Sequence, residues 1–592
     1  MCGIYVAVCD DAQEKVLAGL KRLEYRGYDS WGVAVVSDTA LHIEKYVGQI
    51  GAVQELLLPS TRVALGHTRW ATHGGVTQAN AHPHSASDDS FVLVQNGVVE
   101  NYQELKASLK TEGYEFVSQT DTEVIVRLLE KEMKKGGEEL PSRTSFQATM
   151  DQLEGRSTVA VLAQNNLLLL YRNGSPLVLG KNKKGAVFCS SDVLSMAGDA
   201  TEYYTVENGE VVTISPTGEV VCFTTSSDEP VVMRYKKIDV EAHTIDKNGY
   251  AHYMLKEIFD QGQVLLQVTN QPAAELKKTV SYIKNARMVY TLGAGSASFA
   301  AQFLSFQLRQ LGIQSDSLPS YEARSFQSLF QKDDVVIVFS QSGETADTNE
   351  VVEWMKKQGV KVVSIVNMLG STLTRLSDSP HMLQVGPEVA IASTKALSGQ
   401  LVWSLFIAWL VAGKSEQDFR KQLQVYQAHL QEWLESTSLQ HQLEELSVQL
   451  LQHNQMFILG RGQLHTSALE FALKMKEISY IHAEGFSGGE LKHGVIALIS
   501  SGTPVFCLIA QDSEKADMLS AAAEVRARGG WVVGVARENN ELFSEWIQLP
   551  EDELFVAISS FVPAQLLTYY LALKHGFDPD KPRNLAKSVT VK

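Results

Sequence analysis

The chain has 592 residues, 44% of them hydrophobic, which is typical of a globular protein too long for a single core, so two to four domains are expected. A net charge of −16 and the lack of long Lys or Arg runs argue against a nucleic-acid partner and an anionic membrane surface. The five cysteines form no Cys-x-x-Cys pair and no disulfide pattern, which fits a reducing, cytoplasmic setting.

The N-terminus lacks the basic and apolar segments of a secretory signal. The longest apolar stretch that we identify, Leu401 to Gly413, is too short to span a bilayer. We therefore expect a soluble protein without a membrane partner and interpret this stretch as a core helix.

Cys2 directly follows the initiator methionine. If Met1 is removed, Cys2 carries both a nucleophilic thiol and an α-amine with an ordinary pKa of about 7.7 to 8.0, which can accept the thiol proton. The alternative is a small buried residue, as most cysteines are.

Short β-type runs separated by turn residues dominate as far as Phe223, and a polar, irregular stretch follows. Beyond it, apolar strands, glycine-containing turns and amphipathic helices alternate, which is typical of parallel α/β units. Val289–Gly295 is repeated as Met456–Gly462, about 167 positions later. We predict a β-rich domain over 1–224, a linker over 225–248, and two similar α/β domains over 249–425 and 426–592.

The first domain contains candidate groups for amide hydrolysis by a thiol. Asn96 and Gly97 follow an apolar run and suit an oxyanion hole, although Asn-Gly is also the strongest hairpin-turn dipeptide. Arg69 is a natural clamp for an amino-acid carboxylate, and Asp121 is available for its ammonium group. Four histidines between positions 67 and 84 could suggest zinc, but His82-Pro83-His84 leaves no helix to present ligands on one face.

This domain resembles the N-terminal-nucleophile glutaminase domain of glutamine amidotransferases. The resemblance rests on Met1–Ile4, Leu23–Ser30, His67–Gly74, Asn80–His84 and Asn96-Gly97. It implies an αββα sandwich, removal of Met1, attack of Cys2 on the glutamine side-chain amide, and an oxyanion hole at Asn96 and Gly97. It also implies a glutamine-binding set of Arg69, Thr72, His73 and Asp121, and an ammonia-channel gate at Trp70.

An apolar strand ending at Phe339 leads directly into Ser340-Gln341-Ser342-Gly343-Glu344-Thr345 and then a helix. Hydroxyls and backbone N–H groups at a helix N-terminus form a phosphate cradle, although Ser342 or Thr345 could simply be an N-cap. The equivalent turn of the second repeat, 510–514, is acidic, so we expect phosphate only in the first copy.

Glu470, Lys474 and Glu477 share one face of a predicted helix that starts near Thr466. They are either a surface ion-pair ladder or, because their neighbours are apolar, a partly buried group in which a carboxylate could act as a general base. Lys587 has apolar neighbours near the chain end, which favours a docked Schiff-base amine over the solvated lysine that is usual there.

The C-terminal residues resemble the paired sugar-isomerase domains of the glutamine:fructose-6-phosphate amidotransferase family. The resemblance rests on 340–345, Ala392–Lys395, Lys476–Glu484, Gly489–Gly494 and Asn584–Val591. It implies two doubly wound domains that bind the sugar phosphate through Ser340, Gln341, Ser342, Thr345 and Ser393. It further implies an imine at Lys587, proton transfer by Glu477, ring opening by His493 of a neighbouring subunit and thus a homodimer. The family usually has Cys-Gly-Thr-Ser where this chain has Ala294–Ala297, so one hydroxyl is absent and Ser296 remains as a contact.

Together these expectations describe ammonia transfer from glutamine to fructose 6-phosphate, with glutamate and glucosamine 6-phosphate as products and no metal or redox cofactor. Amidophosphoribosyl transfer is an alternative, but it needs an acidic pyrophosphate loop in place of the serine-rich one. A sugar-phosphate sensor is another alternative, and it would have no use for Lys587 and Glu477.

Overall fold

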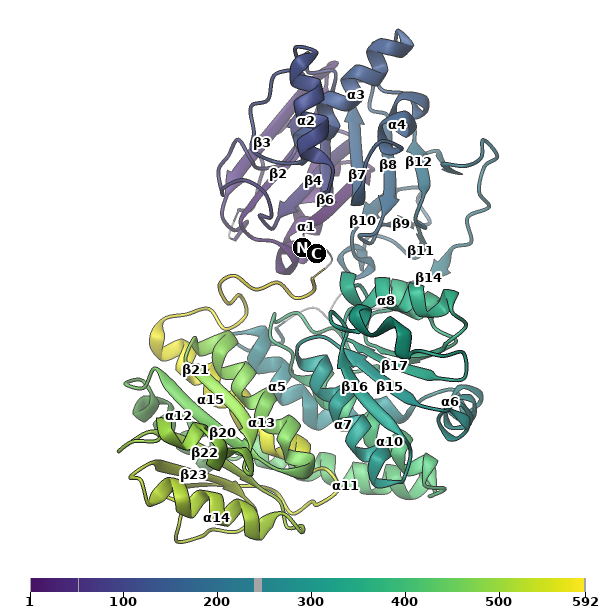
Figure 1. Ribbon diagram of the computed structural model, residues 1–592. Helices are drawn as coiled ribbons and strands as arrows, with labels where there is room; N and C mark the ends of the chain where they lie inside the picture. Colours follow the sequence, from purple (N-terminus) through teal and green to yellow (C-terminus); the bar gives the residue numbers. More distant parts are fainter. Residues whose placement is uncertain (1, 52, 239–246, 590–592) are drawn as a thin grey trace. The chain divides into compact units, whose positions relative to one another are not determined.

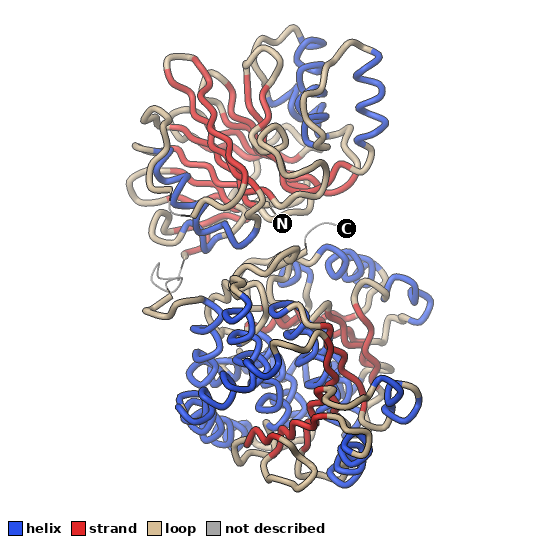
Figure 2. Tube along the Cα trace, turned by 90° about the vertical axis from the view of Figure 1, so that its left-hand side faces the viewer, coloured by secondary structure: helices blue, strands red, loops and turns tan. Residues whose placement is uncertain are grey.

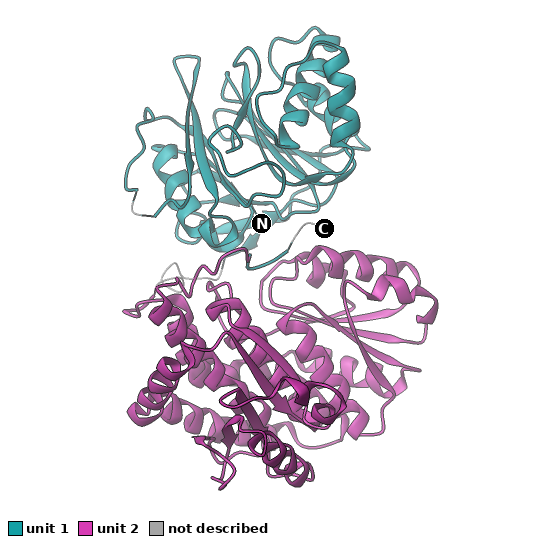
Figure 3. Ribbon diagram, turned by 60° about the vertical axis from the view of Figure 1, so that its left-hand side comes forward, with its two compact units in different colours: residues 1–244, 586–592 teal, residues 245–585 magenta. Residues whose placement is uncertain are grey.

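The computed structural model describes residues 2–51, 53–238 and 247–589, which form two compact units (Figure 3). Unit 1 comprises residues 1–244 and 586–592, and unit 2 comprises residues 245–585. Met1, residues 239–246 of the expected linker and residues 590–592 lie outside the described residues. The boundary between the units falls within the expected linker of 225–248, whose earlier part forms a short strand in unit 1. Unit 1 is rich in strands and unit 2 in helices (Figure 2).

Unit 1 contains two antiparallel sheets. The first has the order β14-β11-β9-β10-β1-β4-β2-β3. Its strands are β1 (Gly3–Val8), β2 (Ser30–Ser37), β3 (Ala40–Val47), β4 (Val63–Arg69), β9 (Val178–Lys181), β10 (Val187–Ser190), β11 (Glu202–Thr205) and β14 (Lys236–Lys237).

The second sheet has the order β13-β12-β8-β7-β6-β5. Its strands are β5 (His84–Ser85), β6 (Phe91–Val99), β7 (Gly155–Ala163), β8 (Leu168–Asn173), β12 (Glu210–Ile214) and β13 (Val220–Thr224). The short β-type runs expected as far as Phe223 are present as the strands of these two sheets.

Helices cover the outer faces of the two sheets, which pack on each other. Ile4 and Leu65 of the first sheet share a core with Val94 and Leu162 of the second. Helix α1 (Ala12–Leu23) covers the first sheet. Helices α3 (Thr122–Gly136) and α4 (Arg143–Met150) cover the second, and α2 (Tyr102–Thr111) packs beside α3 (Figure 1). The predicted αββα sandwich is confirmed.

Unit 2 contains two parallel five-stranded sheets. One has the order β16-β15-β17-β18-β19, with β15 (Val289–Gly293), β16 (Ser315–Pro319), β17 (Val335–Ser340), β18 (Lys361–Val366) and β19 (Ser379–Met382). The other has the order β21-β20-β22-β23-β24, with β20 (Gln455–Gly460), β21 (His482–Ser487), β22 (Pro504–Ile509), β23 (Trp531–Ala536) and β24 (Glu545–Gln548). The matching strand orders confirm the predicted repeat.

Each of these sheets has helices on both faces, which is why its strands are continuously apolar. A shared core between the sheets contains α5 (Tyr253–Val264), α6 (Ala273–Asn285), α7 (Ser296–Gln310), α10 (Lys395–Val411), α11 (Glu416–Glu435), α12 (Thr437–Leu450), α13 (His465–Lys474) and α15 (Val556–His575). On the outer faces lie α8 (Ala346–Lys357) and α14 (Lys515–Arg526), and the short α9 (Thr372–Leu376) lies beside α8. The expected division at 425/426 stays a prediction, and those two residues belong to α11.

Helix α15 is the apolar segment that the sequence analysis missed. The helix has 20 residues, more than the stretch Leu401–Gly413, and it is long and apolar enough to cross a membrane. However, 89% of its apolar window is buried inside the protein, so it serves as a core helix of unit 2. The stretch at 401–413 is confirmed as part of the buried helix α10, which ends at Val411.

Candidate active site

Cys2 lies immediately before β1, where the pairing of Gly3 with Thr68 brings it beside the end of β4. The Cys2 Sγ accepts a hydrogen bond from the Trp70 backbone N–H at 3.3 Å and lies 3.6 Å from the Trp70 carbonyl oxygen. Desolvation raises the pKa of the thiol, while the Trp70 N–H and the Arg69 charge oppose that rise. The thiol is thus held by backbone at the start of the interior strand β1, next to the predicted glutamine-binding residues.

Asn96 and Gly97 lie within β6, where they pair with Thr158 and Ser157 of β7. The hairpin-turn alternative is therefore wrong for this dipeptide. Gly97 has φ +132°, and a Cβ added there would lie 1.8 Å from the Arg156 carbonyl oxygen, so only glycine fits. The strand is locally distorted at the residue whose N–H is the predicted oxyanion donor.

The Asn96 side chain is buried and hydrogen-bonded on both sides. Its Oδ1 is 3.1 Å from His67 Nε2, and its Nδ2 donates to Ser191 Oγ at 2.8 Å. Ser191 Oγ also accepts from the Ile4 N–H at 2.9 Å, so the same hydroxyl holds β1 just after Cys2. These bonds connect the predicted oxyanion group to the strand that carries the nucleophile.

Arg69 is only 3% exposed and donates to the backbone of the loop that follows it. Its guanidinium reaches the carbonyl oxygens of His73 at 2.6 Å and Gly75 at 3.3 Å. Asp121 is buried as well, and its Oδ2 accepts from the Val99 N–H at 2.8 Å. Burial raises the pKa of Asp121. In this structure Arg69, the predicted clamp for the substrate carboxylate, therefore binds carbonyl groups of the loop that follows it.

The remaining predicted residues of the glutamine site lie on that loop. His73 Nδ1 is 3.9 Å from Asp121 Oδ1 and 3.4 Å from Thr72 Oγ1, so these three predicted residues come together. The Trp70 ring packs edge-on against Tyr28, with centroids 5.5 Å apart. The loop conformation therefore controls the predicted binding and channel residues together.

Several supporting residues received no role in the sequence analysis. Arg26 Nε donates to the Cys2 carbonyl at 3.3 Å, and Asp29 Oδ2 accepts from the Ala71 N–H at 2.8 Å. Both belong to the motif Leu23–Ser30, which could have identified them. Ser191 has no local signal, because it reaches the site only through the pairing of distant strands.

The predicted phosphate loop is a tight turn between β17 and α8. Ser340 Oγ accepts from the Gly343 N–H at 2.9 Å, and Ser342 Oγ accepts from the Glu344 N–H at 3.2 Å. Gly343 has φ +66°, and a Cβ there would lie 2.3 Å from Ser371 Oγ. Thr345 occupies the N-cap position of α8, but its hydroxyl makes no capping hydrogen bond within the described residues. The N-cap interpretation therefore explains the position of Thr345 but gives its hydroxyl no role.

Ser296 and Ser393, two further predicted sugar-site residues, lie at or just before the N-termini of helices of unit 2. Ser296 is the first residue of α7. Ser393 Oγ donates to Glu388 Oε2 at 3.4 Å, just before α10. The Gln341 carbonyl accepts from the Asn367 N–H at 3.1 Å, which ties the phosphate loop to the segment after β18.

Glu470, Lys474 and Glu477 form a buried triad in which Lys474 Nζ lies 3.3 Å from Glu470 Oε1 and 2.5 Å from Glu477 Oε2. Lys474 and Glu470 are almost completely buried, whereas the Glu477 side chain is 21% exposed, so the surface-ladder alternative is wrong. Burial raises the pKa of Glu470 to about 7 against the opposing charge of Lys474. Glu477 lies in a π turn, Met475–Ser479, and is the carboxylate that solvent or substrate can reach.

His493 and Lys587 lie outside this triad. His493 ends a short 3₁₀ helix, Glu490–His493, and is exposed. Lys587 is half-buried in the segment 586–592 of unit 1, whereas Glu477 belongs to unit 2. The tail just before it is held in unit 2, where the Arg583 N–H donates to Tyr480 Oη at 2.8 Å. The meeting of Lys587, Glu477 and His493 in one site stays a prediction.

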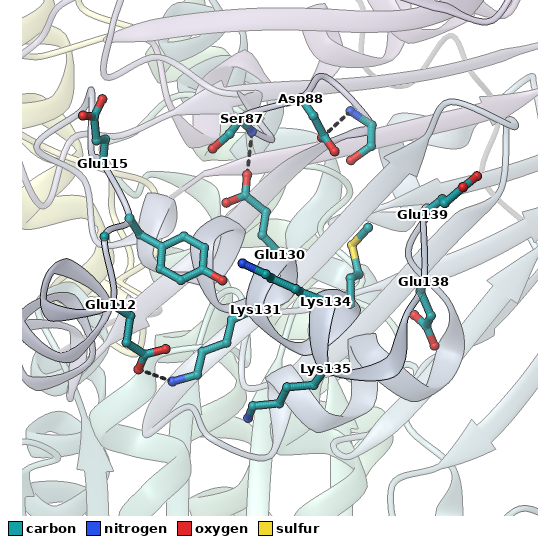
Figure 4. Close-up of a pocket in the computed structure, with 14 residues that line it drawn as sticks. Ser87, Asp88, Glu112, Glu115, Glu130, Lys131, Lys134, Lys135, Glu138 and Glu139 are labelled. Atoms are coloured by element: carbon teal, nitrogen blue, oxygen red, sulfur yellow. Dashed lines mark hydrogen bonds and ion pairs between the residues drawn. The ribbon is translucent and has the colours of Figure 1, made fainter.

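A surface hollow of about 1020 Å³ in unit 1 has none of the predicted site residues in its lining (Figure 4). It is lined mainly by Lys and Glu side chains of α3 and the neighbouring loops, including an ion pair between Lys131 Nζ and Glu112 Oε1 at 2.5 Å. Its lining holds six carboxylates and three lysines, so the hollow is acidic. Within the described ranges, no group of three or more His, Cys, Asp or Glu side chains is arranged to hold a metal ion.

Comparison with known proteins covers the whole chain. Residues 42–207 match the glutamine amidotransferase domain, and residues 282–408 and 449–574 each match the SIS domain. The chain is 37% identical over 610 residues to the glutamine–fructose-6-phosphate aminotransferase (isomerizing) of Pyrobaculum aerophilum, and 36% identical over 612 residues to that of Staphylococcus aureus, with 100% of each chain covered. A solved C-terminal domain of glucosamine-fructose-6-phosphate aminotransferase from Francisella tularensis is 31% identical, with a TM-score of 0.51, and covers 57% of this chain and 99% of that one.

Proposed function

The chain belongs to the glutamine–fructose-6-phosphate aminotransferase (isomerizing) family, and from this premise we propose that it performs this family's reaction with the residues described above. It transfers ammonia from the glutamine side-chain amide to fructose 6-phosphate and isomerises the product. Glutamate and glucosamine 6-phosphate result, which is the first step of amino-sugar synthesis leading to UDP-N-acetylglucosamine.

In the glutaminase half, Cys2 attacks the glutamine amide after removal of Met1 has exposed its α-amine as the proton acceptor. Asn96 and Gly97 stabilise the oxyanion of the tetrahedral intermediate. This intermediate collapses to a thioester on Cys2 as the C–N bond breaks, and the α-ammonium of Cys2 returns the thiol proton to the leaving nitrogen, which departs as ammonia. When glutamine binds, before this attack, it displaces the loop carbonyls from Arg69, so that the guanidinium pairs with the α-carboxylate while Asp121 binds the α-ammonium of the substrate. Thr72 and His73 complete this binding set. Water releases glutamate from the thioester and regenerates the thiol.

In the isomerase half, the loop Ser340–Thr345 binds the phosphate, with Ser296 and Ser393 as further contacts. Backbone N–H groups at the start of α8 favour a dianion there. Lys587 condenses with the C2 carbonyl of the open-chain ketose and releases water, and ammonia then displaces the lysine. Glu477 moves a proton from C1 to C2, and His493 assists ring opening.

Ammonia must reach the sugar without dilution, because in bulk water near neutral pH it is mostly protonated and not nucleophilic. Trp70, directly beside the Cys2 thiol, is the proposed gate of the internal passage. His493 comes from a neighbouring subunit, which makes the protein a homodimer. We place this enzyme in the cytoplasm, where both substrates and reduced cysteines are expected.

The observation that supports the proposal best is the combination on one chain of the Cys2 thiol beside Arg69 and Trp70 with the serine-rich loop 340–345 of the isomerase half. Amidophosphoribosyl transfer would need an acidic pyrophosphate loop, and the loop after β17 is instead built from hydroxyls and a tight glycine turn. A sugar-phosphate sensor would not require the buried triad around Glu477.

The test uses full-length protein with glutamine and fructose 6-phosphate, and measures glutamate and amino-sugar phosphate. Cys2→Ala should lose both glutaminase activity and synthesis but still bind fructose 6-phosphate, while Cys9→Ala, a matched control in unit 1, should keep all three. Lys587→Ala should lose synthesis and retain glutaminase activity, while Lys574→Ala should resemble wild type. Glutamine hydrolysis by Cys2→Ala would refute the proposal.

A further inference from the structure

His67 lies in β4, two residues before Arg69, and its side chain is completely buried. Its ring stacks on His82 with centroids 4.1 Å apart, and the His82 ring packs on His84 at 4.8 Å. The function proposed above gives no role to any of these three buried histidines. A packing role is the simplest explanation, but the polar contacts of His67 are more specific than packing requires.

His67 Nε2 faces two oxygen atoms, the Gln95 carbonyl at 3.0 Å and Asn96 Oδ1 at 3.1 Å. A main-chain carbonyl can only accept a hydrogen bond, so Nε2 must carry the ring hydrogen. The other nitrogen, Nδ1, is buried and has no hydrogen-bond partner within the described residues, as expected for the bare nitrogen of a neutral ring. Burial lowers the pKa of His67 to about 3, in agreement with this neutral form.

The His67 tautomer also decides the orientation of the Asn96 amide. Because Nε2 is a donor, the amide atom facing it must be the oxygen, and the amide nitrogen must face Ser191 Oγ, 2.8 Å away. One N–H of Asn96 is then used by Ser191, and the second N–H has no partner within the described residues. With the amide reversed, a hydrogen-bond acceptor would take the place of that donor.

We propose that His67 is a positioning residue for glutamine hydrolysis, which acts through the Asn96 side chain and turns its amide N–H toward the developing oxyanion. This inference rests on the proposed glutaminase function. The His82 ring, on which His67 stacks, is itself fixed by two polar contacts. Its Nδ1 accepts from the Gln95 N–H at 3.3 Å, and its Nε2 lies 3.3 Å from Thr122 Oγ1. His82 is thereby held between β6 and the start of α3, and the His67 ring stacks on it.

The test compares His67→Leu, which removes the donor, with His67→Gln, whose side-chain amide can place an N–H near the position of Nε2. His84→Gln is the matched control, because it alters the same buried stack at the ring remote from Asn96. Each protein is assayed for the kcat and KM of glutamine hydrolysis. Inhibition is measured with glutamate and with the aldehyde analogue of glutamine, which forms a tetrahedral adduct on the Cys2 thiol.

We expect His67→Leu to lower kcat about 100-fold, in the range for loss of one oxyanion donor, with KM changed less than threefold. Binding of the aldehyde should weaken by a similar factor, because its adduct has the oxyanion, while glutamate binding should stay within threefold. His67→Gln should recover most of the activity, and His84→Gln should remain within threefold of wild type. Equal weakening of aldehyde and glutamate, or equal damage by His84→Gln, would overturn the inference.

A measurement on the wild-type protein covers the case in which His67→Leu does not fold. The ¹⁵N spectrum of histidine-labelled protein should show His67 with Nε2 protonated and Nδ1 bare, assigned by the loss of its signals in His67→Gln. The opposite tautomer would overturn the inference while leaving the proposed function intact. Absence of glutamine hydrolysis by wild type would instead overturn the proposed function, and this inference with it.

Discussion

Lys474→Met is expected to destabilise unit 2 strongly, because Lys474 is the cation between two carboxylates in a buried triad. Its Nζ lies 3.3 Å from Glu470 and 2.5 Å from Glu477, and Lys474 itself is completely buried. Methionine replaces most of the volume of the aliphatic chain, so the loss is mainly electrostatic. The Glu470 carboxyl is left in a buried site without its partner.

Removing one member of a buried ion pair typically costs about 3–5 kcal/mol. Glu470 can limit this cost by taking up a proton, since its pKa is already raised to about 7 with Lys474 present and must rise further without it. When the pKa of a carboxyl is higher in the folded state than in the unfolded state, the free energy of unfolding falls as pH increases from the unfolded-state pKa to the folded-state pKa. The additional rise in the variant therefore extends this loss above pH 7, at about 1.4 kcal/mol per pH unit.

The assay is urea unfolding at pH 6, 7 and 8, followed by tryptophan fluorescence. Trp31 and Trp70 belong to unit 1 and the other tryptophans to unit 2, so the signal reports mainly on unit 2. Adding Glu470→Gln to Lys474→Met should remove the pH-dependent part of the loss. A decrease in the free energy of unfolding of less than about 1 kcal/mol at pH 8, with no growth as pH rises, would refute the reasoning. A buried, unpaired carboxylate must destabilise the protein by more than that.

Three further changes test other parts of the molecule. Gly343→Ala places a Cβ 2.3 Å from Ser371 Oγ, so the KM for fructose 6-phosphate should rise at least tenfold in the synthesis assay while glutaminase activity stays within twofold; unchanged sugar affinity would contradict the phosphate assignment. Gly97→Ala places a Cβ 1.8 Å from the Arg156 carbonyl and forces β6 from β7, so calorimetry should show a loss of about 2–4 kcal/mol in unit 1 together with loss of glutaminase activity. Because the pKa of buried His67 is lowered to about 3, the unfolded chain binds a proton that the folded state does not, and stability should fall as pH decreases below about 6.5, at up to about 1.4 kcal/mol per unit for this group. In urea titrations between pH 7 and 5, His67→Gln should reduce that slope, and an unchanged slope would show that His67 does not carry the effect.

Elements that depend on local pattern were predictable from the sequence. The apolar runs that become β17, β18, β20, β22 and β23 each bury both faces, so their continuous hydrophobicity marked them as parallel strands. The serine-rich turn after β17 and the start of α13 near Thr466 also follow from local signals. The repeat offset of about 167 residues then indicated two similar sheets.

Features that depend on distant pairing were not predictable in this way. Asn-Gly favours a hairpin turn locally, but pairing with β7 draws Asn96 and Gly97 into a strand. Ser191 reaches Asn96 across 95 positions. The π turn around Glu477 is also hidden, because the spacing of Glu470, Lys474 and Glu477 looks like an ordinary helix face in sequence. Helix α15 was missed because its polar residues, such as Gln565, interrupt an otherwise apolar run.

The central claim is that one chain releases ammonia at Cys2 and delivers it to the sugar without mixing it with the solvent. The most direct test supplies glutamine labelled with ¹⁵N in its amide, fructose 6-phosphate and an excess of unlabelled ammonium, and measures ¹⁵N in the product by mass spectrometry. We predict glucosamine 6-phosphate whose nitrogen is almost entirely ¹⁵N, formed in equal amount to glutamate. Product with mainly unlabelled nitrogen, or glutamate formed without amino-sugar phosphate, would contradict the account.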